Sequence, residues 1–253
     1  MTSLPDILTS SLGREAVAPP ERLMEHSIDG VPPEAVVFPA KVEDVSEVLS
    51  LASREKKAVT PWGGGTQMAL GNTPSRVGIV LGTSRLNRVL LHEPADLVTS
   101  TEAGITLKAL QDELAKDGQF LPLEAPLPDS ATIGGMLAAN ASGPSRLAYG
   151  TARDWLIGIK VVQPNGVITK SGGRVVKNVA GYDLHRLYTG SLGTLGLIVE
   201  ANFKVAPLPP DKRTQIATYR SLSDATDSAY GLLRRSFIPQ ALLVINRAVV
   251  DRP

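Results

Sequence analysis

The segment TPWGGGTQMALGN, residues 60–72, places three consecutive glycines directly after the short apolar stretch AVTPW. Glycine has no Cβ, so such a run lets the backbone turn sharply or approach another group closely. Successive main-chain amides in such a loop can also converge on an anion, for example the oxygens of a phosphate. The segment lacks both the Gly-Lys-Ser/Thr of a Walker loop and the G-x-G-x-x-G spacing of a dinucleotide fingerprint. A tight turn and an anion-binding nest are both compatible with these residues alone.

A β-α-β pattern surrounds this glycine loop. We predict strands over 34–40, 58–62 and 76–82, and a helix that begins at residue 42 and has apolar positions at helical spacing. Strands joined through a helix in this way imply a small parallel sheet.

Further along, residue patterns predict alternating helices and strands. Asn165-Gly166 is a strong turn signal and predicts a hairpin over 155–170. We predict other strands over 96–104 and 193–207, and helices over 106–118, 131–140 and 180–191. A new unit begins near residue 213, with a predicted strand over 215–221, a helix over 224–236 and a strand over 240–250. The fold class is therefore α/β or α+β, with a short arm over residues 1–29.

The composition excludes several classes of site. The 253 residues carry 26 Lys and Arg against 25 Asp and Glu, so no basic field for nucleic acid is expected. Cysteine is absent, which excludes disulfides, a cysteine nucleophile and an iron–sulfur cluster held by this chain. The three histidines, His26, His92 and His185, lack metal-ligand spacing, so no metal site is predicted. Without an evident signal peptide or membrane span, we expect a cytoplasmic protein.

Two more segments are rich in small residues. Residues 123–158 are dense in Gly, Ala, Ser and Asn, which suits either a packed small-residue helix or the edge of a polar heterocycle. Residues 172–198 hold further glycines beside Arg174 and Lys177, cations that could contact phosphate or simply be solvated.

Taken in order, these blocks resemble one family. PWGGGTQ (61–67), PDSATIGGMLAANASG (128–143), YGTARDWLIG (149–158) and GGRVVKNVAGYDLHRLYTGSLGTLGLI (172–198) are similar to the PCMH-type FAD-binding domain of vanillyl-alcohol-oxidase-type flavoproteins. HSIDGVPPEAVVFPAKVEDVSEVL (26–49) matches the entry strand and helix of that family. Within the family, the chain is most similar to FAD-binding subunits of glycolate oxidases, relatives of the D-lactate dehydrogenases. The resemblance covers roughly residues 26–207.

The resemblance implies a fold with two subdomains that hold FAD between them. One is a small parallel β-α-β unit, and the other is a larger, mostly antiparallel sheet with helices. It places the PCMH-type domain at 30–208, and 209–253 as the start of a truncated or minimal C-terminal cap domain.

The resemblance also implies which residues bind the cofactor, and it assigns none to catalysis. The loop that matches Trp62–Gln67 wraps the FAD pyrophosphate with backbone amides in the family, while later blocks lie near the flavin and the adenosine. The residues carried over are Trp62, Gly63, Gly64, Gly65, Thr66, Gln67, Pro128, Ser130, Thr132, Ile133, Gly134, Asn140, Ser142, Gly143, Tyr149, Gly150, Gly196 and Ile198.

Two positions in the loop depart from relatives. Members that attach flavin covalently often carry a histidine where Thr66 stands, and no histidine lies in this loop, so FAD is expected to bind non-covalently. Trp62 stands where many relatives have arginine; its ring could shield the pyrophosphate or simply pack.

The resemblance implies an FAD-binding subunit of a 2-hydroxy-acid (glycolate-type) oxidase or dehydrogenase complex. The region after Pro207 holds no histidine to act as a catalytic base. A paired catalytic flavoprotein subunit and an iron–sulfur subunit are therefore expected as partners, and the complex could lie at the inner membrane through them. The alternatives are a stand-alone FAD-dependent oxidase of another alcohol or hydroxy acid, and a non-catalytic FAD-binding assembly subunit.

Overall fold

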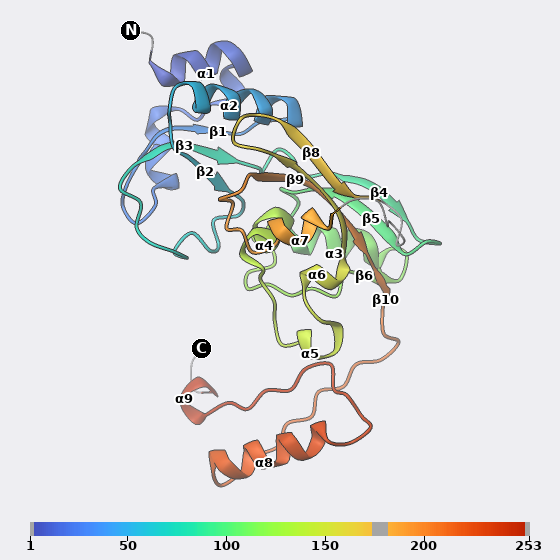
Figure 1. The fold of residues 1–253 in the computed structure, drawn as a ribbon. Helices are drawn as coiled ribbons and strands as arrows, with labels where there is room; N and C mark the ends of the chain where they lie inside the picture. The colour runs from blue at the N-terminus through green and yellow to red at the C-terminus, as the bar shows by residue number, and fades with distance from the viewer. Residues whose placement is uncertain (1–2, 174–181, 251–253) are drawn as a thin grey trace.

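The computed structural model describes residues 3–173 and 182–250 of the chain. Two sheets organise it, a small parallel sheet and a five-stranded antiparallel sheet, with helices packed against both (Figure 1). This architecture confirms the predicted fold class.

The small sheet contains β1 (Pro33–Val37), β2 (Val59–Trp62) and β3 (Val77–Gly82) in the order β1-β3-β2, and both pairings are parallel. Helix α2 (Val42–Arg54) connects β1 to β2. Its apolar residues and those of the small sheet form one hydrophobic core. The central strand β3 is buried along its whole length, as expected for a parallel strand. The predicted β-α-β unit is therefore confirmed, and the glycine run begins where β2 ends.

The N-terminal arm lies against the small sheet. It contains α1 (Leu4–Leu12) and two short 3-10 segments, η1 (Arg14–Ala16) and η2 (Pro20–His26). Backbone hydrogen bonds fasten it to β1 and the residue that follows: the Ala18 amide donates to Val36 (2.9 Å) and the Phe38 amide to Ala16 (2.7 Å). Leu8 is fully buried in the same core as α2.

The larger sheet has the order β4-β5-β9-β7-β8, and every neighbouring pair is antiparallel. The predicted hairpin around Gly166, which adopts a φ of 86°, is confirmed, whereas the sequence did not predict β4. The strands are β4 (Val89–Glu93), β5 (Val98–Glu102), β7 (Leu156–Val162), β8 (Ile168–Gly172) and β9 (Leu197–Lys204).

Helices cover one face of the larger sheet (Figure 1). Helix α7 (Leu184–Tyr188) is shorter than the predicted helix over 180–191, whose first residues lie outside the described part of the chain. The other short elements are α3 (Leu107–Ala115), β6 (Gln119–Phe120), α4 (Ile133–Ala139), α5 (Arg146–Tyr149), α6 (Ala152–Trp155) and β10 (Ala206–Pro207).

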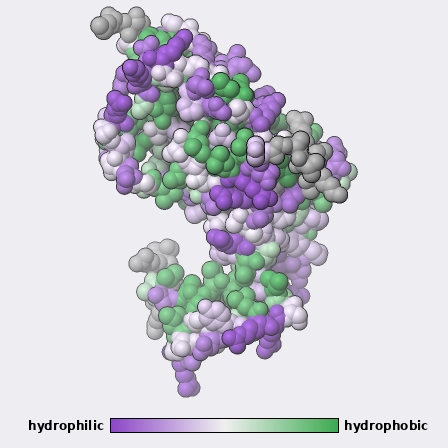
Figure 2. All heavy atoms as spheres, in the orientation of Figure 1, coloured by the Kyte–Doolittle hydropathy of each residue, from purple (hydrophilic) through white to green (hydrophobic). Residues whose placement is uncertain are grey.

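Residues 209–250 form a C-terminal extension with α8 (Leu222–Leu233) and α9 (Arg247–Val250). The predicted helix over 224–236 is confirmed with shifted bounds, but the predicted strands over 215–221 and 240–250 are wrong. Within the described residues neither segment pairs with another strand, and strand pairing is what satisfies extended backbone. Helix α8 buries none of its residues, and apolar side chains gather on the extension (Figure 2).

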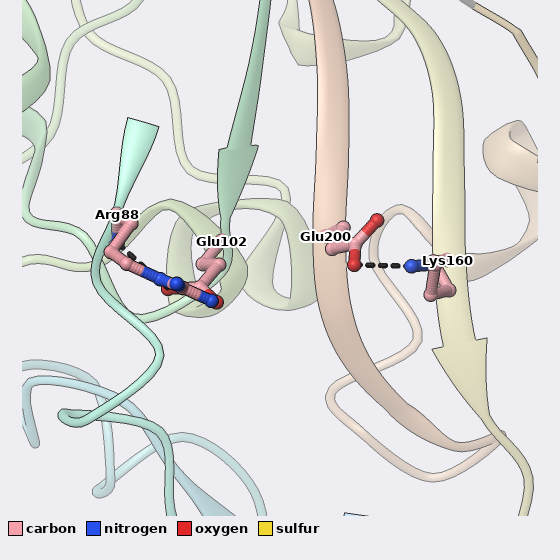
Figure 3. Close-up of polar contacts among 4 residues, drawn as sticks. All are labelled: Arg88, Glu102, Lys160 and Glu200. Atoms are coloured by element: carbon pink, nitrogen blue, oxygen red, sulfur yellow. Dashed lines mark hydrogen bonds and ion pairs between the residues drawn. The ribbon is translucent and has the colours of Figure 1, made fainter. Parts of the chain in front are cut away.

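Two ion pairs lie side by side on one face of the larger sheet (Figure 3). Glu102 on β5 and Glu200 on β9 are direct cross-strand neighbours. The buried Glu102 carboxylate accepts hydrogen bonds from the Arg88 guanidinium (Nη2–Oε1, 2.8 Å) and the Arg88 amide (2.8 Å). Lys160 on β7 pairs with Glu200. Each carboxylate therefore has its own cation, which offsets the repulsion between the two acids.

We expect Glu102→Gln to lower the free energy of unfolding by about 1–2 kcal/mol, because a buried charged acceptor is lost. Urea unfolding followed by circular dichroism measures the change. Glu25→Gln, which removes a carboxylate from an exposed pair with Arg22, serves as the control and should leave the midpoint unchanged. Equal midpoints for both variants would show that the Glu102 contacts do not hold the sheet.

Candidate functional site

A cleft with a volume of about 260 Å³ opens beside the glycine loop. Its walls come from three distant parts of the chain: the end of β2 with the loop after it, helix α4, and the turn that leads into β9. The predicted site residues that line it are Trp62, Gly63, Gly64, Gly65, Thr66, Gln67, Thr132, Gly134, Gly196 and Ile198.

The glycines are required because the loop lies directly against the turn before α4. A Cβ on Gly64 would overlap the carbonyl oxygen of Ser130, and a Cβ on Gly63 would overlap the hydroxyl of Thr132. Gly65 has a φ of 72°, and a Cβ there would lie 2.8 Å from the ring of Trp62. Side chains at Gly63 and Gly64 would push the loop away from the turn before α4, whereas a side chain at Gly65 would clash with Trp62 within the loop itself.

The loop also offers unused hydrogen-bonding groups to the cleft. Within the described residues, the amides of Gly63, Gly64, Gly65, Thr66 and Gln67 donate to no protein acceptor. The side-chain oxygen Oε1 of Gln67 is buried and has no hydrogen-bond partner. Since buried polar groups are normally paired, this arrangement fits a polar ligand that accepts bonds from the amides and donates one to Gln67.

Helix α4 presents a small-residue surface to the cleft. Gly135, Ala138 and Ala139 line the cleft, while Ile133 and Leu137 are buried in the core behind them. Met136 is the one larger α4 side chain that also lines the cleft, and beside it the glycine and two alanines let a flat ring lie close to the helix backbone.

The amides at the start of α4 are already used within the protein. The Ile133 amide donates to Ile105 (2.9 Å), the Gly134 amide to Ala103 (2.7 Å), and the Gly135 amide to the hydroxyl of Thr132 (3.3 Å). Ile133 is buried and lies behind the cleft surface, and Gly134 packs closely on Ala103. Among the described residues the Thr132 amide donates to no protein acceptor, so this turn adds one free amide to those of the glycine loop.

The turn before β9 closes the third side. The Gly190 amide donates to Leu137 (2.9 Å) and the Leu192 amide to Ala138 (2.8 Å), which fixes the turn to α4. A Cβ on Gly193 would lie 2.8 Å from Pro61, so this turn also touches the end of β2. Gly196 has a φ of 153° and packs on Val162.

The remaining predicted site residues do not line this cleft. Pro128 and Ser130 are exposed on the turn behind the glycine loop, and Asn140 caps α4 with a φ of 51°. Arg174 and Lys177 lie outside the described residues. Four others, Ser142, Gly143, Tyr149 and Gly150, follow α4 along the chain.

Those four residues have protein partners. Ser142 accepts a hydrogen bond from Arg146 (3.4 Å), and Gly143 packs on Glu124. Tyr149 packs edge-on against Phe120, at 5.6 Å between ring centroids, and against Trp155, at 6.4 Å.

Gly150 lies beside the cap of α6. Its φ is 78°, and a Cβ there would lie 2.5 Å from the carboxylate of Asp154. The amide and hydroxyl of Thr151 donate to that carboxylate and hold the pKa of Asp154 below its usual value. The carboxylate is therefore charged near neutral pH and fixes this turn.

The histidines stand apart from the cleft. His26 packs beside the ring of Trp62, at 5.0 Å between centroids, so Trp62 both lines the cleft and packs behind it. His92 hydrogen-bonds Gln119 (2.9 Å), and burial lowers the pKa of His185 on α7. In the described part of the chain no cluster of three or more His, Asp or Glu side chains could hold a metal ion.

Nor does any described helix have the length and apolarity to cross a membrane.

Sequence reasoning missed much of the cleft. Most of the unassigned lining residues lie in the glycine-rich and small-residue segments already noted, whose composition carried a signal: Thr60, Pro61, Met68, Leu70, Asn72, Ala125, Ala131, Gly135, Met136, Ala138, Ala139, Leu192, Gly193 and Leu197. Ile28, Pro74 and Thr83 lie outside those segments and join the cleft only through tertiary structure.

Comparisons with known proteins identify the group to which this chain is similar. A family model described as an FAD binding domain matches residues 33–172. The glycolate oxidase subunit GlcD of Bacillus subtilis is 33% identical over 222 residues, which cover 86% of this chain and 47% of the relative. A mitochondrial cytochrome-type D-lactate dehydrogenase of Arabidopsis thaliana is 37% identical over 78% of this chain and 34% of the relative.

Two further comparisons extend the group. A D-2-hydroxyglutarate dehydrogenase of Xanthomonas citri is 34% identical over 73% of this chain and 39% of the relative. Among solved structures, an alkyldihydroxyacetonephosphate synthase superposes with a TM-score of 0.62 at 28% identity, over 72% of this chain and 33% of that one. The chain thus spans about half the length, or less, of these relatives.

We expect Gly64→Ala to reduce the flavin that copurifies with the protein to below about a tenth of the wild-type content, because the new Cβ displaces the loop from Ser130. Flavin absorbance per protein measures the loss, and circular dichroism checks the fold. Gly231→Ala, in open space on α8, is the matched control and should keep the flavin. Full flavin content in the Gly64 variant would refute the expectation that the glycine loop is needed to bind the flavin.

Proposed function

This chain belongs to the FAD-binding domain family, and we propose that it binds FAD non-covalently in the cleft beside Gly63–Gln67 as the flavin subunit of an enzyme that oxidises small 2-hydroxy acids. The observation that carries the proposal is the row of unbonded amides along the glycine loop, with the unpartnered Gln67 oxygen beside it. Phosphate oxygens accept such bonds, and a hydroxyl or amine of the cofactor can donate to Gln67.

The cleft residues have separate tasks in this proposal. The amides of the glycine loop bind the pyrophosphate and offset its negative charge. The small face of α4, with Gly135, Ala138 and Ala139, accommodates a flat ring and excludes water from it. When bound, FAD supplies the redox chemistry by accepting two electrons from the substrate.

The substrate class comes from the relatives. Glycolate, D-lactate and D-2-hydroxyglutarate, which appear in their names, all carry a hydroxyl next to a carboxylate. Oxidation of such a hydroxyl needs a base for its proton and a cation for the carboxylate. Among the described residues, those that line the cleft include no histidine, aspartate or glutamate to act as this base, and we assign the base to a paired catalytic subunit.

The electron acceptor is assigned to a partner as well. This chain has no cysteine and cannot ligate an iron–sulfur cluster through thiolates. An iron–sulfur subunit that receives electrons from the flavin is the partner that fits. The similar Bacillus subtilis protein is itself named as a subunit.

Non-covalent attachment is supported by Thr66 in the cleft and by the position of all three histidines outside its lining. We expect acid precipitation of the purified protein to release the yellow colour into the supernatant. Colour that stays with the pellet would contradict non-covalent binding.

We expect the flavin of the isolated chain to bleach with dithionite but to stay oxidised with glycolate, D-lactate or D-2-hydroxyglutarate. The chain copurified with its partners should bleach with at least one of these acids under anaerobic conditions. The visible flavin absorbance band measures both results. Full turnover by the chain alone would refute the need for a catalytic partner. A flavin in the complex that none of the acids reduces would favour a non-catalytic assembly role.

A further inference from the structure

Leu192 has a backbone conformation that leucine rarely adopts. Its φ of 52° lies in the left-handed region, where the Cβ of an L-residue crowds the following carbonyl oxygen. Gly190 and Gly193 in the same turn have φ values of 85° and 73°, so three of the four residues 190–193 have a positive φ. Glycine occupies two of these positions, but the third holds a large apolar side chain.

Packing within the protein does not account for Leu192. Leu97 has a similar φ of 55°, but it lies in the hairpin turn between β4 and β5 and packs against the core. The side chain of Leu192 instead remains 52% exposed and lines the cleft. An exposed leucine with this backbone conformation gains little from packing in the unliganded protein. Leu127 also has a φ of 55° and is 65% exposed, but it lies outside the cleft lining, so the strain supports a ligand contact only together with the position of Leu192 in the cleft.

The position of the turn is tightly fixed. The Leu192 amide donates to the carbonyl of Ala138 (2.8 Å), which lies on the small-residue face of α4. The next residue, Gly193, touches Pro61 at the end of β2. Leu192 is therefore held where α4 and the small sheet converge, with its side chain free to contact a ligand.

We propose that Leu192 is a specificity-determining residue of the cleft, whose side chain packs on an aromatic ring of the bound dinucleotide next to Ala138. The inference rests on the proposed binding of FAD in this cleft. Binding buries the leucine side chain, and this apolar burial offsets the conformational strain that the unliganded turn carries. A glycine at 192 would relieve the strain but would give up the contact.

The test compares Leu192→Gly, Leu192→Ala and Leu192→Met with wild type in the full chain. FAD affinity of the apoprotein is measured by titration, and thermal unfolding of the apoprotein is measured in parallel. Leu192→Gly should raise the unfolding temperature and weaken FAD binding about tenfold. Leu192→Ala should weaken binding to a similar degree without raising the unfolding temperature, since alanine keeps the left-handed cost. Leu192→Met should bind FAD within about threefold of wild type.

Leu195→Ala is the matched control, because Leu195 lies in the same turn, is 43% exposed and does not line the cleft. Leu195→Ala should leave the affinity for FAD unchanged.

A second measurement uses pyrophosphate, which has no ring, as a competitor of FAD for the cleft. Pyrophosphate should bind all variants equally.

The outcomes separate the two proposals. Wild-type protein that binds no FAD would overturn both. Wild-type protein that binds FAD, with unchanged affinity in Leu192→Ala, would overturn the role of Leu192 alone. Equal losses for FAD and pyrophosphate would also overturn it, since they would indicate damage to the glycine loop. Opposite changes in stability and affinity for Leu192→Gly would support it, because a purely structural residue would change both in the same direction.

Discussion

The cleft depends on the close approach of two backbone segments, Gly63–Gly64 from the small sheet and Ser130–Thr132 from the turn before α4. At Gly64 the two segments meet main chain to main chain, and at Gly63 the loop meets the hydroxyl of Thr132. This contact fixes the distance between the cleft walls. It also keeps the loop amides away from protein acceptors, which leaves them available to a ligand. The packing need for glycine is thus observed, whereas the binding of an anion by the free amides stays a prediction.

Local sequence patterns predicted the elements that depend mainly on interactions between residues close together in the chain. The β-α-β unit, the hairpin at Asn165-Gly166 and the glycine loop all rest on periodicity or turn chemistry within a few residues. Strand β4 was missed because it lies half-buried near the sheet edge and shows no clear alternation. The strands predicted over 215–221 and 240–250 have apolar sequences, yet a strand also needs a neighbour, which a single segment cannot reveal.

The candidate site likewise contains residues that the sequence could predict and residues that it could not. The glycine loop was predictable because its residue types are unusual, and the family resemblance placed it at the pyrophosphate. Pro61, Met68 and Leu192 are ordinary residues that become cleft walls only when three distant segments meet. Conversely, Tyr149 and Gly150 matched the resemblance, but here they pack with Phe120 and Asp154 outside this cleft. Their contribution to cofactor binding stays a prediction.

The position of β9 in the larger sheet has a consequence for the order in which the protein forms. This strand lies between β5 and β7 and pairs with both, although it is the last of the five in the chain. During synthesis β5 can pair with β4 at once, but nearly a hundred residues follow before its second partner β9 emerges, whereas the small sheet is complete by Gly82. Long-range pairing of this kind slows folding, and it leaves strand edges open to aggregation in the meantime. The turn that carries Leu192 precedes β9 directly, so the cleft is among the last features to close.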